Sequence, residues 1–203
     1  MKITRITQQV KQVNRYSVYV DKKYSFSLSE TALIKCAIAS GQELTEQQIE
    51  KYKQLSVDDK AYARALRYVA MRQRTTWEIE TYLARKQLAE PLISDIVQRL
   101  ADLSLLNDAA YAISFVHDRQ LLRPTSRRKL ILELKKKHIS DSHIQAALEA
   151  VTVDENDNLR DLITKKRRQS KYQDDTKLMQ YLARQGFGYG DIKAAIQAGT
   201  IAF

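Results

Sequence analysis

The chain repeats one pattern of apolar residues three times, at a nearly constant spacing. The pattern has five positions and starts at Ile79, Leu130 and Leu178, so successive copies are 51 and 48 residues apart. The copies are Ile79-Leu83-Leu88-Ile93-Val97, Leu130-Leu134-Ile139-Ile144-Leu148 and Leu178-Leu182-Phe187-Ile192-Ile196. Such self-similarity indicates tandem copies of one supersecondary unit that cannot bury its apolar face alone. A repeat array has a long surface and seldom a deep pocket, which favours a binding protein over an enzyme.

Each copy is predicted to form three helices. Its first two apolar positions are four residues apart, as on the buried stripe of a helix. Thr75 followed by Glu78 reads as a capping box, and Pro91 suits a first helical turn. The expected helices span about 58–73, 76–86 and 91–104, then 108–121, 126–137 and 141–151, then 154–171, 175–185 and 189–198.

The first residues of the chain follow a different pattern. Alternating apolar residues from Arg15 to Leu28 predict a β-hairpin, although its turn lacks glycine, and an earlier strand over 2–7 can pair with it. A helix over about 29–39 and a second one opened by Thr45 should follow. The expected fold is therefore mainly α: a small α+β module with a β-hairpin, then three tandem three-helix repeats. The expected domains are 1–57, 58–106, 107–153 and 154–203.

The net charge of +10 over 203 residues is spread along the chain. Lys and Arg exceed Asp and Glu by two or three in each quarter. Positive potential along a whole molecule suits a long anionic partner, such as nucleic acid or an acidic filament surface. A merely solvated surface is the alternative, because Lys and Arg are usually exposed. No apolar run approaches membrane-spanning length and the start lacks a signal-peptide core, so we expect a soluble, cytoplasmic protein without a membrane partner.

Helical phase selects a set of outward-facing basic residues. One position is basic in every copy, two residues after a buried leucine: Arg85, Lys136 and Arg184. If the repeats stack in the same way, these three side chains form a row that matches regularly spaced anions. The predicted electrostatic contact set for a protein filament or DNA is Arg85, Arg128, Lys129, Lys135, Lys136, Lys165, Arg168, Lys171 and Arg184.

Aromatic residues give weaker predictions. Tyr62, Tyr111 and Tyr181 have the spacing of helix-packing residues rather than of base-stacking platforms. Trp77 follows a helix cap and is equally compatible with a partner anchor and with partial burial. Tyr19 lies on the predicted outer face of the hairpin, which makes it the better aromatic candidate for a contact.

The sequence offers no catalytic residues, metal ligands or cofactor-binding residues. The three histidines have no Cys or second His at a zinc-ligand spacing. Walker-type phosphate loops, Gly-rich dinucleotide turns and nucleophile elbows are absent. The carboxylates at 58, 59, 174 and 175 precede predicted helices, where they would cap backbone amides. We therefore expect neither enzymatic activity nor a cofactor.

Short motifs in a fixed order resemble a known family. They are Arg72-Gln73-Arg74-Thr75 with Glu80 and Leu83, Leu106-Asn107-Asp108-Ala109-Ala110-Tyr111-Ala112 with Phe115, Leu130 with Glu133-Leu134-Lys135-Lys136-Lys137, and Tyr181-Leu182-Ala183-Arg184-Gln185-Gly186-Phe187 with Asp191-Ile192. Each motif alone is a weak helix-packing pattern, but their order and spacing resemble the RecX family of bacterial regulators of the RecA recombinase. The resemblance covers residues 58–199 and extends more loosely over the N-terminal module.

The resemblance implies an elongated, curved array of three-helix repeats that acts on RecA. It implies binding in the groove of the RecA filament on single-stranded DNA, restraint of filament growth or promotion of disassembly, and some direct DNA affinity. Two departures stand out. Gln87 and His138 stand where the family often has a glycine after the middle helix, and Arg123-Pro124 replaces an expected Gly-Pro. A missing C-terminal glycine costs a helix about 1 kcal/mol or less.

The functional expectation is a non-enzymatic, mostly negative regulator of RecA that modulates recombination, DNA repair and the SOS response. Its partners would be the RecA filament and, more weakly and without sequence preference, single- and double-stranded DNA, and we expect a monomer. Three alternatives remain open. They are a stand-alone DNA-binding protein, a repeat-array adaptor that holds another protein, and a metal-dependent nuclease that uses the carboxylates at 58, 59, 174 and 175.

Overall fold

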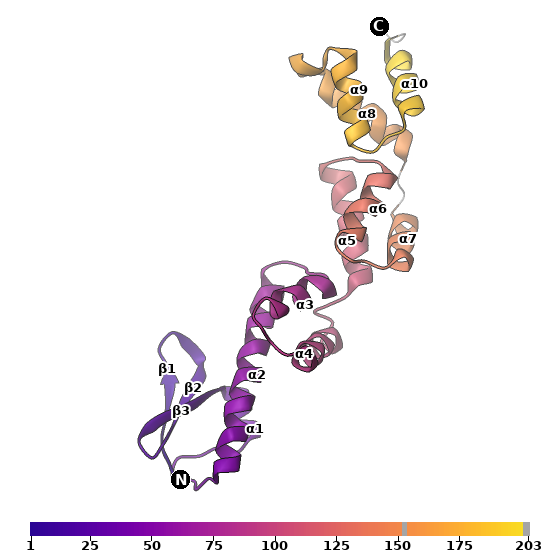
Figure 1. Cartoon of the computed structure of the whole chain (residues 1–203). Coiled ribbons are helices and arrows are strands. Elements are labelled where there is room, and N and C mark those ends of the chain that lie inside the picture. The colour runs from indigo at the N-terminus through magenta and orange to yellow at the C-terminus, as the bar shows by residue number, and fades with distance from the viewer. Residues whose placement is uncertain (152–153, 201–203) are drawn as a thin grey trace. The chain divides into compact units, whose positions relative to one another are not determined.

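The computed structural model describes residues 1–151 and 154–200, which form two compact units (Figure 1). The first unit holds Met1–Arg72 and Ile79–Leu105. The second holds Gln73–Glu78 and the described chain from Leu106 onward. The short segment Gln73–Glu78 therefore packs with residues that follow it by more than thirty positions in the sequence.

The first unit begins with a three-stranded antiparallel sheet of β1 (Ile3–Gln9), β2 (Gln12–Val20) and β3 (Lys23–Ser29), in that order. The predicted hairpin and the earlier strand are both confirmed. The hairpin turn needs no glycine because Asp21 and Lys22 both adopt positive φ, 46° and 68°, as a two-residue hairpin loop requires. The Lys2 amide donates to Asp21 Oδ1 at 2.9 Å and helps to hold this turn.

Two helices follow the sheet within the first unit. Helix α1 (Glu30–Lys35) is shorter than expected, since Ala37 turns to φ 50° directly after its end. Helix α2 (Glu46–Met71) starts at the predicted capping box, in which Thr45 and Gln48 each bond the other's backbone amide. The sheet lies beside the N-terminal part of α2 (Figure 1).

One prediction for this unit is wrong: no helix begins at position 58, because α2 runs through that position without a break. Polar residues in this part of α2 make tertiary contacts with the sheet instead. Ser56 Oγ donates to the Ser27 carbonyl at 2.6 Å, and Asp59 accepts from Arg15 Nη1 at 2.8 Å. Asp59 also accepts from the Ser29 amide at 2.8 Å. Asp58 and Asp59 therefore cap no helix.

The remaining helices start and end close to their expected limits. The one clear difference is the helix expected over 154–171, which ends at Arg167 and is followed by a 3₁₀ turn. The elements are α3 (Thr76–Ala84), α4 (Glu90–Asp102), α5 (Asp108–Leu122), α6 (Arg127–Lys135), α7 (Asp141–Ala150), α8 (Glu155–Arg167), η1 (Ser170–Tyr172), α9 (Asp175–Arg184) and α10 (Tyr189–Thr200). No helix in the described part of the chain is both long and apolar enough to cross a membrane.

The repeated apolar positions form the cores of the three-helix repeats. All fifteen are buried except Leu88 and Val97, which are half-buried. The copy that starts at Leu130 packs with Ala112 and Val116 of α5, and the copy that starts at Leu178 packs with residues of α8. The mainly α architecture with three repeats is therefore confirmed.

Each middle helix is followed by one residue in the left-handed region. These residues are Gln87 (φ 59°), His138 (φ 58°) and Gly186 (φ 91°). The glycine of the third repeat is thus replaced in the other two by residues that adopt the same backbone conformation. The substitution of glycine leaves the turn after the helix intact.

Candidate binding surface

A basic groove opens on the second unit between α5, α6, α8 and α9. Its volume is about 550 Å³. Its charged residues come from the C-terminal end of α5, one face of α6 and the last turn of α8. The cationic residues that line it, hereafter the basic groove, are Arg119, Arg123, Lys129, Lys165 and Lys166.

The groove carries a strong excess of positive charge. Glu133 is the single carboxylate among its described lining residues, and it pairs with Arg119 at 3.0 Å. Four further cations remain around the same space. Converging Lys and Arg side chains concentrate positive potential in a concave surface, and this attracts phosphates or clustered carboxylates.

A dense set of hydrogen bonds joins the second and third repeats beside the groove. The Gln185 carbonyl, at the end of α9, accepts from Thr125 Oγ1 at 3.1 Å and from Ser126 Oγ at 2.9 Å. Both hydroxyl residues are almost fully buried. At Gly186 a Cβ atom would overlap Ser126 Oγ, so the close approach requires glycine. We call this arrangement the Ser126 contact.

Two of the groove lysines are held by neighbouring side chains. Lys129 Nζ donates to Gln185 Oε1 at 2.6 Å, which adds to the Ser126 contact. Lys166 Nζ lies 4.6 Å from the centre of the Tyr181 ring and 5.3 Å from that of Tyr172. Contacts with neutral partners position these ammonium groups without cancelling their charge.

A second contact of the same kind involves the segment 73–78 of the same unit. Thr75 and Glu78 form the predicted capping box, and the Thr76 amide donates to Asp108 Oδ1 at 2.9 Å. Lys137 Nζ reaches Glu78 Oε1 at 2.6 Å, and the His138 ring stacks on Trp77 with 4.3 Å between centroids. We call this arrangement the Thr75 contact.

The structure brings part of the predicted contact set together. Lys129 and Lys165 line the basic groove. Arg85 belongs to the first unit, whereas Lys136 and Arg184 belong to the second, so the row of these three stays a prediction. All nine predicted residues are exposed except Lys129, which is half-buried: Arg85, Arg128, Lys129, Lys135, Lys136, Lys165, Arg168, Lys171 and Arg184.

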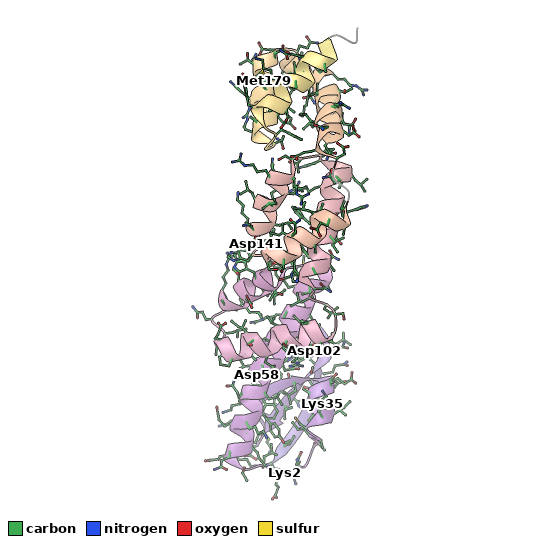
Figure 2. The ribbon with its side chains drawn as sticks, turned by 90° about the vertical axis from the view of Figure 1, so that its right-hand side faces the viewer. Lys2, Lys35, Asp58, Asp102, Asp141 and Met179 are labelled. Atoms are coloured by element: carbon green, nitrogen blue, oxygen red, sulfur yellow. The ribbon has the colours of Figure 1, made fainter. Side chains whose placement is uncertain are left out.

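Some predicted residues have partners of their own. Lys135 pairs at 2.9 Å with Asp141, which begins α7 and is labelled in Figure 2. Arg184 Nε donates to the Gln180 carbonyl at 3.2 Å within its own helix. Lys135 therefore has less charge available to a partner than the groove lysines have.

Sequence reasoning missed Arg119, Arg123 and Lys166. Arg119 and Arg123 lie at the end of a first helix for which no outward face was assigned. Lys166 follows Leu162 by four residues, so helical phase places it on the face expected to be buried. The groove forms where helices of two repeats meet, so a pattern read within one repeat does not reveal it. The available signal was the pair of arginines four residues apart immediately before Pro124.

The aromatic candidates have intramolecular partners. Trp77 is half-buried against His138, which favours partial burial over the anchor interpretation. Tyr19 is half-buried, with Arg5 at 4.4 Å from its ring centre and Tyr24 at its edge. Tyr62 packs under Arg99 at 3.9 Å, as a packing residue would.

The carboxylates considered for catalysis have structural roles in three of four cases. Asp59 pairs with Arg15, Asp174 caps α9, and Asp175 pairs with Arg167. Among the described residues, no group of three or more His, Cys, Asp or Glu side chains is placed to hold a metal ion.

Comparisons with known proteins identify the family. Models described as the "Regulatory protein RecX N-terminal domain" and as the first, second and third three-helix domains of RecX match residues 1–45, 61–100, 107–148 and 154–196. The chain belongs to the RecX family. The four RecX matches follow the order of the sheet module and of the three repeats described above.

Individual RecX proteins are similar over most of their length. The chain is 29 % identical to the regulatory protein RecX of Bacillus subtilis, covering 96 % of this chain and 75 % of that protein. It is 31 % identical to that of Oceanobacillus iheyensis, over 97 % and 76 %. A crystal structure of a regulatory protein RecX is similar with a TM-score of 0.73 and 29 % identity, covering 97 % of this chain and 98 % of that one.

Proposed function

We propose that this chain regulates the RecA recombinase, mostly negatively, by binding the RecA filament on single-stranded DNA. It limits growth of the filament or promotes its disassembly, and so modulates recombination, DNA repair and the SOS response. Membership of the RecX family carries the proposal, because the similar proteins are named regulatory proteins. The protein acts by binding rather than by catalysis, as a monomer in the cytoplasm.

The proposed mechanism is occupancy of the filament groove. The repeats contact neighbouring RecA subunits, and the module 1–57 precedes them. The limits of the repeats are 58–106, 107–153 and 154–203. Occupancy disturbs the interface that subunit addition or ATP turnover requires. The basic groove supports this mechanism, since five cations against one paired carboxylate suit an acidic protein surface or DNA phosphates.

The test is the DNA-dependent ATP hydrolysis of RecA on single-stranded DNA. We expect strong inhibition when this protein is present at well below one copy per RecA, since so little protein cannot mask the DNA. Inhibition only at saturation of the DNA would contradict action on the filament. It would favour a stand-alone DNA-binding protein, whose log affinity falls linearly with log salt.

Charge-reversed variants locate the surface. Lys165→Glu with Lys166→Glu should weaken inhibition of RecA, because both lysines line the basic groove. Lys177→Glu with Lys193→Glu is the matched control, as both residues are exposed, lie in the same unit and do not line the groove. Lys135→Glu with Lys136→Glu tests the middle helix of the second repeat. Equal loss in all three double variants would mean that net charge alone drives binding.

A further inference from the structure

A second positively charged groove lies in the first unit, between the sheet and α2. Its volume is about 260 Å³. Strand residues form one wall and one face of α2 forms the other. The described residues that line it, hereafter the sheet–helix groove, are Gln9, Gln12, Arg15, Tyr24, Ser27, Lys60, Ala63, Arg64 and Arg67.

The charge of Arg15, the buried cation of this groove, is compensated within the protein. Arg15 is 4 % exposed, and it donates to Ser27 Oγ at 3.0 Å, to the Ser27 carbonyl at 2.7 Å and to Asp59 Oδ2 at 2.8 Å. The ion pair with Asp59 compensates its charge. Arg15 therefore fixes β2 and β3 to α2 and leaves the recognition of a ligand to the walls.

The helical wall carries the uncompensated charge. Lys60, Arg64 and Arg67 are all exposed and are separated by four and three residues, so they follow one face of α2. A helix rises about 1.5 Å per residue, which places their Cα atoms about 6 Å and 4.5 Å apart along the axis. None of the described lining residues is a carboxylate that could oppose them.

The strand wall carries an aromatic ring and amides. Tyr24 is 54 % exposed, and its ring is oriented by an edge contact with Tyr19, with 6.1 Å between centroids. Gln9 and Gln12 line the same wall with side-chain amides. A line of cations facing an exposed aromatic ring is the combination that binds single-stranded nucleic acid, with phosphates on one side and a stacked base on the other.

We propose that the sheet–helix groove binds the sugar–phosphate backbone of single-stranded nucleic acid through Lys60, Arg64 and Arg67, with a base stacked on Tyr24. A run of carboxylates on a protein would satisfy the cations but would leave the aromatic ring and the amides without a matching partner. This site is separate from the basic groove of the second unit and is independent of any effect on RecA.

The test is direct binding of a fluorescein-labelled oligothymidylate to the full chain, followed by anisotropy over about 50 to 200 mM salt. Arg64→Ala with Arg67→Ala should weaken binding about tenfold at low salt. The slope of log affinity against log salt should fall in magnitude by about 1.4, or about 0.7 for each lost phosphate contact on a single strand. Alanine favours helix, so α2 should persist in the variant.

Two further variants separate the explanations. Lys51→Ala with Lys53→Ala removes the same charge from exposed positions on the same helix outside the groove, and it should change affinity and slope much less. Tyr24→Leu should weaken binding at least about fivefold with an unchanged slope, because stacking carries no charge. An equal loss in the control variant would overturn the proposal. Unchanged oligonucleotide binding in Arg64→Ala with Arg67→Ala would also overturn the proposal. If that variant bound the oligonucleotide normally but no longer inhibited RecA, the groove would be a contact for protein instead.

Discussion

The second unit contains the same contact twice, made with different chemistry. Thr75 and Ser126 are 51 residues apart, and His138 and Gly186 are 48 apart, which are the offsets that align the repeats. In the Thr75 contact an ion pair and an aromatic stack meet after a middle helix. In the Ser126 contact the hydroxyl groups of Thr125 and Ser126 donate to the Gln185 carbonyl, and Lys129 donates to the Gln185 side-chain amide. Gly186 occupies the position that corresponds to His138.

The difference shows that a repeat preserves the position of a contact rather than the residues that make it. Both contacts use the capped start of a middle helix and the left-handed turn after another middle helix. Where a glycine occupies the turn, the backbones approach closely. Where His138 occupies it, the extra side chain is accommodated as the partner of a tryptophan.

The largest expected effect on stability comes from replacing Gly186 of the Ser126 contact with histidine, the residue at the corresponding position of the Thr75 contact. Gly186→His adds a side chain at φ 91° and forces its Cβ atom onto Ser126 Oγ. Left-handed backbone and overpacking together should lower the free energy of unfolding by about 2–4 kcal/mol. Urea denaturation of the full chain measures this loss. An unfolding free energy equal within error to that of the parent chain would show that a side chain at position 186 does not clash with Ser126.

The reciprocal change should have a smaller effect. His138→Gly relieves a non-glycine residue at φ 58° but removes the stack on Trp77. These two consequences oppose each other, and each amounts to about 1 kcal/mol. We therefore expect a net change of about 1 kcal/mol or less by the same denaturation measurement. A loss as large as that of Gly186→His would mean that the two turns do not differ in the way described.

Removing the ion pair should have an effect between those of the two preceding variants. Lys137→Ala removes one ion-pair partner, at 2.6 Å, from Glu78, whose side chain is 9 % exposed. We expect a loss of about 1–2 kcal/mol, because the carboxylate still accepts from the Thr75 amide. Lys136→Ala is the neighbouring control on an exposed side chain and should change stability by about 0.5 kcal/mol or less. Similar losses in both variants would argue against a specific role for the pair.

A double variant sharpens the comparison most directly. Lys129→Glu with Gln185→Lys would transfer the ion pair of the Thr75 contact to the Ser126 contact, because these positions correspond to Glu78 and Lys137. Lys129→Glu alone should cost about 1 kcal/mol by facing the Gln185 amide oxygen and the Arg184 carbonyl. The second change should recover about 0.5–1 kcal/mol, as a double-mutant cycle would measure. Additive effects would show that the two contacts are not interchangeable.

The sequence predicted the repeats well because their cores are local. The apolar positions of one copy lie within twenty residues of each other, and helical periodicity is sufficient to identify them. The caps at Thr75, Ser126 and Asp174 follow from short-range rules as well. The turn at Asp21 was harder to recognise, because two non-glycine residues adopt positive φ there.

Long-range partners explain the failures. Asp58 and Asp59 look like the start of a helix, and only the fold reveals that Asp59 binds Arg15 of the sheet. Arg119 and Lys166 are ordinary exposed-helix residues by sequence, and they share a groove only because α5 and α8 meet. Residues that contact each other from different elements are not separated by a regular number of positions in the sequence, so an argument from periodicity cannot find them.

The uninterrupted helix α2 has a consequence for how this family can evolve. Its first half carries the sheet, and its second half packs with α4 as part of the first repeat. A gene fusion that joined a new N-terminal module at position 58 would cut this helix and separate Asp59 from Arg15. An exchange of the N-terminal module between relatives is therefore expected not to have its junction at position 58, so that the sheet and the whole of α2 are inherited together.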